Sequence, residues 1–315
     1  MDWEDILRKS GYVGKDHLDA YDLQEKFVAV KIFQKDKYDP GEINAGIELW
    51  KKRKDIVFVL RYIKFDEESV YPMLQMEYAN MMTLDIIAKQ PQITLSNYAL
   101  RALMKQILEG IRSFHAAGLV HRPPGSGRVH AKISDFGFAK KENQINEESD
   151  SNAGTLMYMS PEQFHENLII TQKVDIYAVG ITFYHIITHK YPVNQRNFDE
   201  QKKKFAQIKN IERPHEITDN LLWDLLSKLM EFNPDKRITA DQAILHPFFT
   251  SDEASDISVE QFELAALYDF PEFEKDQFFA KFDINPNFIV PESQEQKLSK
   301  EQLKEQDKEQ EKQQE

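Results

Sequence analysis

The sequence contains no cysteine, which excludes disulfide bonds, cysteine-ligated zinc and a thiol nucleophile. It also lacks a hydrophobic run of the roughly 18 residues that a membrane span needs. The longest candidate, residues 174–187, is interrupted by Asp175 and His185 and is expected to form a buried helix. The acidic N-terminal segment MDWEDILRKS does not have the apolar core of a signal peptide. A soluble cytoplasmic protein is therefore expected, and a nuclear location is also compatible.

Positive charge is in short supply as well, because 53 acidic residues outnumber 40 basic ones and leave a net charge of -13. This balance argues against general binding to nucleic acid or to anionic membranes. Hydrophobic residues make up 41% of the 315-residue chain, which is enough for one large domain or two lobes with a sizeable core.

The pattern changes along the chain from strand-like to helix-like. β-Branched and aromatic residues predict strands over 27–33, 56–63 and 70–77, with a charged turn at 66–69 between the last two. Apolar residues at helical spacing then predict helices over residues 98–117, 174–188, 218–231 and 239–245. Strands followed by helices indicate two segregated lobes of an α+β protein.

The C-terminal part differs in composition. Residues 251–292 combine phenylalanine with acidic residues, a texture suited to docking or, more simply, to packing on the helical lobe. Residues 293–315 are almost entirely Gln, Glu and Lys, and we expect them to be disordered.

Six motifs occur in one particular order. Four contain functional candidates: Val28-Ala29-Val30-Lys31, then Gln75-Met76-Glu77-Tyr78-Ala79, then Asp135-Phe136-Gly137, then Gly154-Thr155 through Ser160-Pro161-Glu162. The last two are Asp175 in an apolar helix and Arg237 in Asn233-Pro234-Asp235-Lys236-Arg237. Each is weak alone, since a strand with an exposed lysine or a bare D-F-G is commonplace, but the ordered set is specific.

Together these motifs resemble the eukaryotic protein kinase family, Ser/Thr type, over roughly residues 10–250. The resemblance implies a bilobal protein-kinase-like fold, with a small strand-rich N-lobe and hinge at 1–79 and a larger helical C-lobe at 80–250. It also implies ATP and Mg²⁺ as cofactors, and a protein substrate or a regulatory protein as partner.

The resemblance assigns roles to individual residues. Lys31 would hold the ATP phosphates, the Glu77 and Ala79 backbone would pair with adenine, and Met76 would be the gatekeeper. Asp135 would bind Mg²⁺, followed by Phe136 and Gly137. Thr155 and Glu162 belong to the activation segment. Glu162 would pair with Arg237, and Asp175 would anchor the catalytic loop.

The catalytic loop departs from the family pattern H-R-D-L-x-x-x-N. His121 and Arg122 are present, but Pro123 occupies the position of the Asp that accepts the substrate proton, and Arg128 the position of the Asn. No carboxylate lies between Arg122 and Asp135, and the loop is about six residues shorter than the family's usual path. His130 is the remaining candidate proton acceptor.

Two further features are degenerate. Gly11 and Gly14 match the last two glycines of G-x-G-x-x-G, whereas Lys9 occupies the place of the first, and an ordinary turn explains the stretch nearly as well. Gly46 falls where the family's helix C glutamate is expected, with Glu42 and Glu48 nearby.

Three interpretations remain open. The chain is an active kinase with a substitute base, a pseudokinase that binds partners with or without nucleotide, or a kinase whose written sequence omits residues from the catalytic loop. The last two have about equal weight, because point substitution does not ordinarily shorten a core loop between two well-matched flanks.

Overall fold

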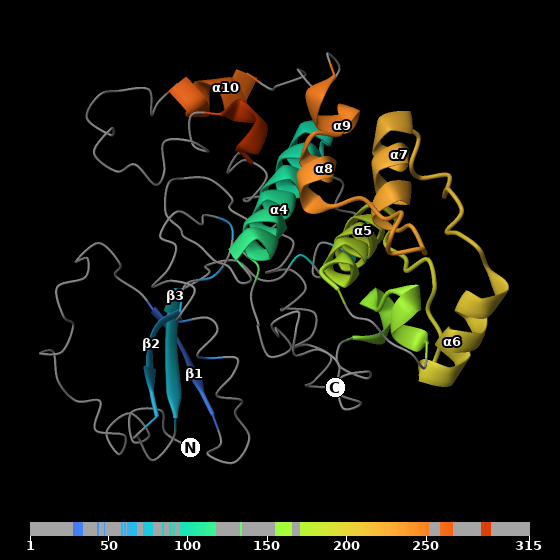
Figure 1. Cartoon of the computed structure of the whole chain (residues 1–315). Coiled ribbons are helices and arrows are strands. Elements are labelled where there is room, and N and C mark those ends of the chain that lie inside the picture. The colour runs from blue at the N-terminus through green and yellow to red at the C-terminus, as the bar shows by residue number, and fades with distance from the viewer. Residues whose placement is uncertain are drawn as a thin grey trace, which may run out of the picture.

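The structure is a computed structural model (Figure 1). It describes residues 28–33, 43, 47, 58, 60, 62–67, 72–77, 84, 88, 89, 91, 95–117, 133, 155–165, 171–251, 259–266 and 285–290.

The N-terminal part forms a three-stranded antiparallel sheet in the order β1-β3-β2. Its strands are β1 (Val28–Ile32), β2 (Tyr62–Asp66) and β3 (Met73–Glu77). The strands predicted over 27–33 and 70–77 are confirmed with slightly narrower bounds. This sheet lies to one side of the helices in Figure 1.

The strand predicted over 56–63 is wrong in its bounds. Phe58 and Leu60 lie outside the sheet, and β2 begins only at Tyr62 and includes Asp66, which the sequence placed in a turn. The reason is a different backbone partner. The Leu60 amide donates to the Ile133 carbonyl at 2.9 Å, and the Ile133 amide donates to the Phe58 carbonyl at 3.2 Å.

The helices follow the sheet in sequence, and the four predicted ones are confirmed to within one or two residues at each end. They are α4 (Asn97–Ala117), α5 (Lys173–Thr188), α7 (Asn220–Leu229) and α8 (Ala240–Ile244). Asp219 and Thr239 cap the starts of α7 and α8 by accepting from backbone amides, as their residue types favour. The short helices are η3 (Leu156–Tyr158), η4 (Pro161–Phe164), α9 (Pro247–Thr250) and η7 (Pro286–Phe288).

Apart from these short helices, two helices of the described residues were not predicted, α6 (Phe198–Gln207) and α10 (Val259–Ala266). In α6 only Gln201 and Phe205 are buried, so its hydrophobic periodicity is faint. Its start is instead fixed by Asn197, whose side chain accepts from the Glu200 amide at 3.0 Å.

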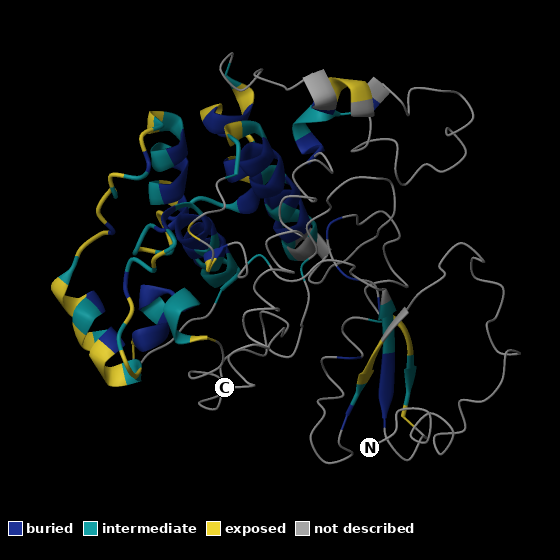
Figure 2. Ribbon diagram, turned by 180° about the vertical axis from the view of Figure 1, so that it is seen from behind, coloured by how far each residue is buried: buried dark blue, intermediate teal, exposed yellow. Residues whose placement is uncertain are grey.

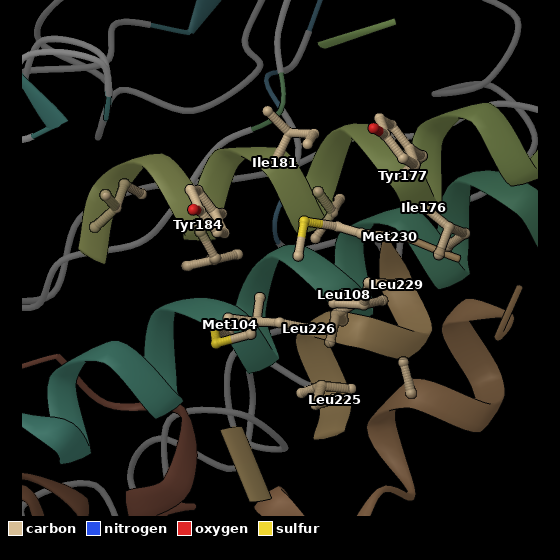
Figure 3. Packing of buried hydrophobic residues seen from close by; sticks show 14 of the residues in the cluster. Met104, Leu108, Ile176, Tyr177, Ile181, Tyr184, Leu225, Leu226, Leu229 and Met230 are labelled. Atoms are coloured by element: carbon tan, nitrogen blue, oxygen red, sulfur yellow. The ribbon is translucent and has the colours of Figure 1, made fainter. Parts of the chain in front are cut away.

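The core of the helical part lies where α4, α5 and α7 meet. Figure 3 shows Met104 and Leu108 of α4 lying together with Leu226 of α7 between the helices, whereas Ile181 of α5 points to the opposite side of that helix. These four residues are at most 1% exposed. Figure 2 shows the same pattern as dark, buried ribbon through the helices, with exposed residues concentrated on α6 and the outer turns.

Helix α5 contains the apolar run that the sequence predicts to be a buried helix, and ten of its residues are buried. Among the described residues, none of the helices combines the length and apolar character needed to cross a membrane.

The described parts of the C-terminal extension pack against the helical part. Both α10 and η7 lie beside the N-terminal half of α4 in Figure 1, and η7 contacts α4 and α10 directly. For these residues the structure shows packing on the large lobe, as the simpler of the two expectations states, together with a contact between Phe288 and Phe58.

Candidate active site

The sheet brings two of the predicted nucleotide-site residues to one face. In the β1–β3 pairing, Ala29 lies opposite Met76 and Lys31 lies opposite Leu74. Directly opposed residues of antiparallel strands project to the same face, so Lys31 and Met76 share a face. Glu77 is the last residue of β3 and pairs with Val28, so the strand ends where the predicted hinge begins.

The Lys31 side chain is exposed, and its ammonium group lies 5.0 Å from the centre of the ring of Phe33, the residue that directly follows β1. Phe33 in turn makes an edge-to-face contact with Phe65 of β2, with ring centres 6.3 Å apart. This aromatic support holds the lysine stem along the sheet face while leaving the ammonium at the surface.

Several predicted site residues lie outside the described part of the chain. They are Gly11, Gly14, Ala79, Pro123, Arg128, His130, Asp135, Phe136 and Gly137. Their roles stay predictions. Ile133, two residues before Asp135, is described and is held by its backbone pairing with Phe58 and Leu60. The described residues contain no group of three or more His, Asp or Glu side chains that could hold a metal ion.

Arg237 is the centre of a buried polar cluster. Its side chain is fully buried and binds both carboxylate oxygens of Glu162, at 2.6 and 2.8 Å. Its remaining N–H groups donate to the carbonyls of Glu231, Lys173 and Phe232, so all five donors have acceptors. The guanidinium also lies 5.1 Å from the centre of the Tyr177 ring.

Two groups beside this buried cluster, the hydroxyl of Tyr177 and the ammonium of Lys173, have shifted pKa values. Desolvation raises the pKa of Tyr177 well above its usual range. Lys173 donates to the carbonyls of Pro234 and Arg237. Desolvation, and then the neighbouring Arg237 charge, lower its pKa. The cluster therefore ties η4, the start of α5 and the Arg237 loop into one rigid unit.

Asp175, in the first turn of α5, contacts His115 at the end of α4. Its carboxylate lies 3.0 Å from Nε2 of His115, and the nearby Gln172 side chain donates to the His115 carbonyl at 3.2 Å. These bonds join the C-terminal end of α4 to the N-terminal end of α5. Residue 118, where the catalytic loop region begins, lies outside the described part, so the anchoring role of Asp175 stays a prediction.

The residues predicted to end the activation segment are held by local hydrogen bonds and one contact with Tyr191. Thr155 precedes η3, and its carbonyl accepts from the Tyr158 amide at 2.9 Å. The Tyr158 hydroxyl lies 3.1 Å from that of Tyr191, and their rings meet edge to face. Ser160 is fully buried, and its hydroxyl donates to the Gln163 side chain at 3.0 Å, which satisfies a polar group in the core.

Sequence reasoning missed three of these contacts: His115 with Asp175, Gln172 with His115, and Tyr158 with Tyr191. Each joins residues far apart in sequence, and no local periodicity reports such a pair. The only available signal was indirect: polar residues occur at the ends of otherwise apolar helices.

The fold and the site define a protein of the bilobal kinase class, with a strand-rich small lobe and a larger helical lobe. The family model described as "Protein kinase domain" matches residues 10–249. The chain therefore belongs to the protein kinase domain family, and the eukaryotic Ser/Thr type expected from its motifs agrees with its relatives.

Curated relatives include the Serine/threonine-protein kinase/endoribonuclease ire-1 of Caenorhabditis elegans, which is 29% identical over 62% of this chain and 22% of its own length. The Serine/threonine-protein kinase cds1 of Schizosaccharomyces pombe is 27% identical over 71% of this chain and 53% of its own. Serine/threonine-protein kinase PLK4 of Nematostella vectensis is 26% identical over 61% of this chain and 20% of its own. The chain thus spans only about a fifth to a half of these relatives.

Among solved structures, one chain of the CAK complex from Chaetomium thermophilum bound to ATP-gamma-S superposes with a TM-score of 0.57. The superposition covers 71% of this chain and 83% of the CAK chain, and the two sequences are 19% identical over it. A likeness at this identity establishes the fold.

Proposed function

We propose that this chain is a Ser/Thr-kinase-like domain that retains part of an ATP–Mg²⁺ site but is impaired in phosphotransfer. The observation that carries the proposal is a contrast within the chain. Lys31 and Met76 share a face of the sheet, and Glu162 and Arg237 form a bidentate ion pair within the large lobe. Yet the sequence between Arg122 and Asp135 contains neither a carboxylate nor an asparagine.

The retained residues suit nucleotide contact. Lys31 would hold the phosphates, Met76 and the end of β3 would border adenine, and Asp135 would hold Mg²⁺, which neutralises phosphate charge when bound. Engagement of phosphate requires the Lys31 ammonium to leave the Phe33 ring. An exposed cation–aromatic contact is worth only about 0.5–1 kcal/mol, so the loss of this contact costs little.

The missing groups concern the other half of the reaction. A kinase must orient the substrate hydroxyl and accept its proton, and in this family an Asp of the catalytic loop does so. Proline at position 123 can do neither, because it has no titratable group. A regulatory role through protein partners then follows for this form, as in a pseudokinase.

One specific observation favours a second candidate, an active Ser/Thr protein kinase. The catalytic loop is too short by about six residues between flanks that match the family well. An expressed form that contains the missing residues would restore the function. Sequencing the transcript across Val120–Lys132 decides between the two candidates.

Nucleotide binding tests the proposed site directly. We expect millimolar ATP analogue with Mg²⁺ to stabilise the protein in a thermal-shift assay, by about 2.7 kcal/mol at 100 times the dissociation constant. Lys31→Met should reduce this stabilisation. Lys64→Met is the matched control, because Lys64 pairs with Gln75, which lies opposite Val30, and therefore projects to the other face of the sheet. If wild-type protein is not stabilised, or both variants behave alike, the proposed site is wrong.

A further inference from the structure

Two phenylalanines from opposite ends of the chain stack on one another. The Phe288 ring of η7 lies parallel to the Phe58 ring, with centres 5.9 Å apart and planes within 6°. Phe58 is 1% exposed and Phe288 is 8% exposed. Phe58 belongs to the segment that leads into β2, so this contact joins the C-terminal extension to the small lobe.

Helix α4 holds the same C-terminal segment from a second side. The amide of Gln106, which is fully buried, donates to the Phe288 carbonyl at 2.6 Å. The ammonium of Lys105 lies 4.8 Å from the centre of the Phe288 ring. A buried amide that donates to one particular backbone carbonyl fixes the register of the segment, because sliding the segment by one residue would break this hydrogen bond.

Helix α10 fastens the segment from a third side. The Gln261 side chain is 2% exposed and donates to the carbonyls of Pro286, at 3.2 Å, and Ile289, at 2.7 Å. Ile289 and Val290 are each 1% exposed. The segment is therefore anchored by buried side chains as well as by directed hydrogen bonds.

The backbone of Phe58 pairs with Ile133, in the segment that leads to Asp135. The Phe58 carbonyl accepts from the Ile133 amide, and the Leu60 amide donates to the Ile133 carbonyl. Gly110 of α4 makes room for both, because a Cβ there would lie 2.9 Å from Cδ1 of Ile133 and 3.0 Å from the Phe58 carbonyl oxygen. Phe58 thus contacts Phe288 through its ring and pairs with Ile133 through its backbone.

We propose that residues 285–290 form a strap that controls the Phe58–Ile133 pairing in cis. With the strap docked, Phe58 is held against α4, and the pairing sets where the chain enters the Asp135 segment. With the strap released, the pairing loosens while the large-lobe core stays intact. The C-terminal extension is in this way a built-in regulator of the segment between the lobes, which goes beyond the proposed nucleotide-binding function.

The competing explanation is that η7 merely adds apolar area to a common core. The two explanations differ in locality. A strap protects the Leu60 and Ile133 amides specifically, whereas a general contribution protects the amides of α7 to the same extent, since these belong to the central core.

Hydrogen exchange on the full chain, without nucleotide, tests the proposal. We expect Phe288→Ala to speed exchange of the Leu60 and Ile133 amides by about tenfold or more, with α7 amides unchanged. Phe262→Ala is the matched control, because Phe262 lies on α10 of the same extension but is 66% exposed. It should leave both amides as in wild type.

Phe288→Leu gives a second reading in case the alanine variant does not fold, because leucine keeps most of the buried volume but removes the ring stacking. We expect the same local effect, reduced to about threefold. Wild-type exchange at Leu60 and Ile133 in a folded variant would overturn the proposal. An equal rise in α7, or failure of both variants to fold, would also overturn it by making the segment an ordinary part of the core.

Discussion

Arg237 and Glu162, 75 residues apart in sequence, form a bidentate ion pair in which the arginine side chain is fully buried and the glutamate side chain is 12% exposed. Such a pair is costly to break, because the surviving partner remains buried without a counter-charge. It contributes no chemistry of its own. It holds η4, which lies at the predicted end of the activation segment, against the Arg237 loop.

Glu162→Gln should therefore lower the free energy of unfolding strongly, by about 3–5 kcal/mol, the range for breaking a buried pair. Glu216→Gln is the matched control, because Glu216 pairs with the largely exposed Lys190 at 2.8 Å. Exposed pairs contribute about 0–1 kcal/mol. Urea denaturation followed by circular dichroism measures both. Equal losses for the two variants would contradict the structural role of the Arg237–Glu162 pair.

His246 should make stability depend on pH. Desolvation lowers the pKa of this imidazole, and the Phe248 amide donates to its Nδ1 at 3.2 Å, which requires the neutral ring. The opposing influence of Asp224, 2.9 Å from Nε2, is smaller, and Lys228 adds to the lowering. Because the unfolded chain binds the proton more readily, stability is complete above about pH 6.5 and falls as pH drops through the folded-state pKa.

His246→Asn isolates this effect, since an asparagine oxygen can still accept from the Phe248 amide but does not titrate. We expect the loss of stability between pH 7 and 5 to be smaller in this variant than in wild type, as measured by denaturation at each pH. His215→Asn is the control, because His215 is 89% exposed. A wild-type pH profile in His246→Asn would refute the assignment.

Gly180 permits the close approach of α5 to the end of α7. A Cβ at this position would lie 2.6 Å from Cγ of Met230 and 3.0 Å from Cβ of Leu229. Overpacking of this kind costs about 1–3 kcal/mol, which outweighs the roughly 1 kcal/mol that alanine gains in helix propensity. Gly180→Ala should therefore lower the melting temperature in differential scanning calorimetry, and an increase would show that the two helices separate easily.

The sequence predicted those parts of the fold whose signal is local. Helices α4 and α7 have regular apolar spacing, α5 is a nearly continuous apolar run, and β1 lies in a β-branched and aromatic run. The strand predicted before β2 was wrong in its bounds because the apolar residues there have a strand-like pattern. Their backbone hydrogen bonds instead join Ile133, more than 70 residues away. Periodicity does not contain that information.

The site was predictable to the extent that it rests on ordered motifs. Lys31, Met76, Glu162 and Arg237 were chosen from motif position, and the structure supplies the geometry that motifs lack: a shared sheet face and a two-oxygen ion pair. The Phe58–Phe288 stack had no motif. Its partners come from opposite ends of the chain, and only the folded chain brings them together.

The most direct measurement is phosphotransfer by the purified full chain with labelled ATP, Mg²⁺ or Mn²⁺ and generic Ser/Thr substrates, beside Asp135→Ala. General acid–base help alone is worth about 10²–10⁴-fold, and the loss of the asparagine and of the loop geometry adds to the deficit. The account predicts little or no turnover in either protein. Robust turnover that Asp135→Ala abolishes would contradict it, and would mean that another group, with His130 the first candidate, accepts the substrate proton.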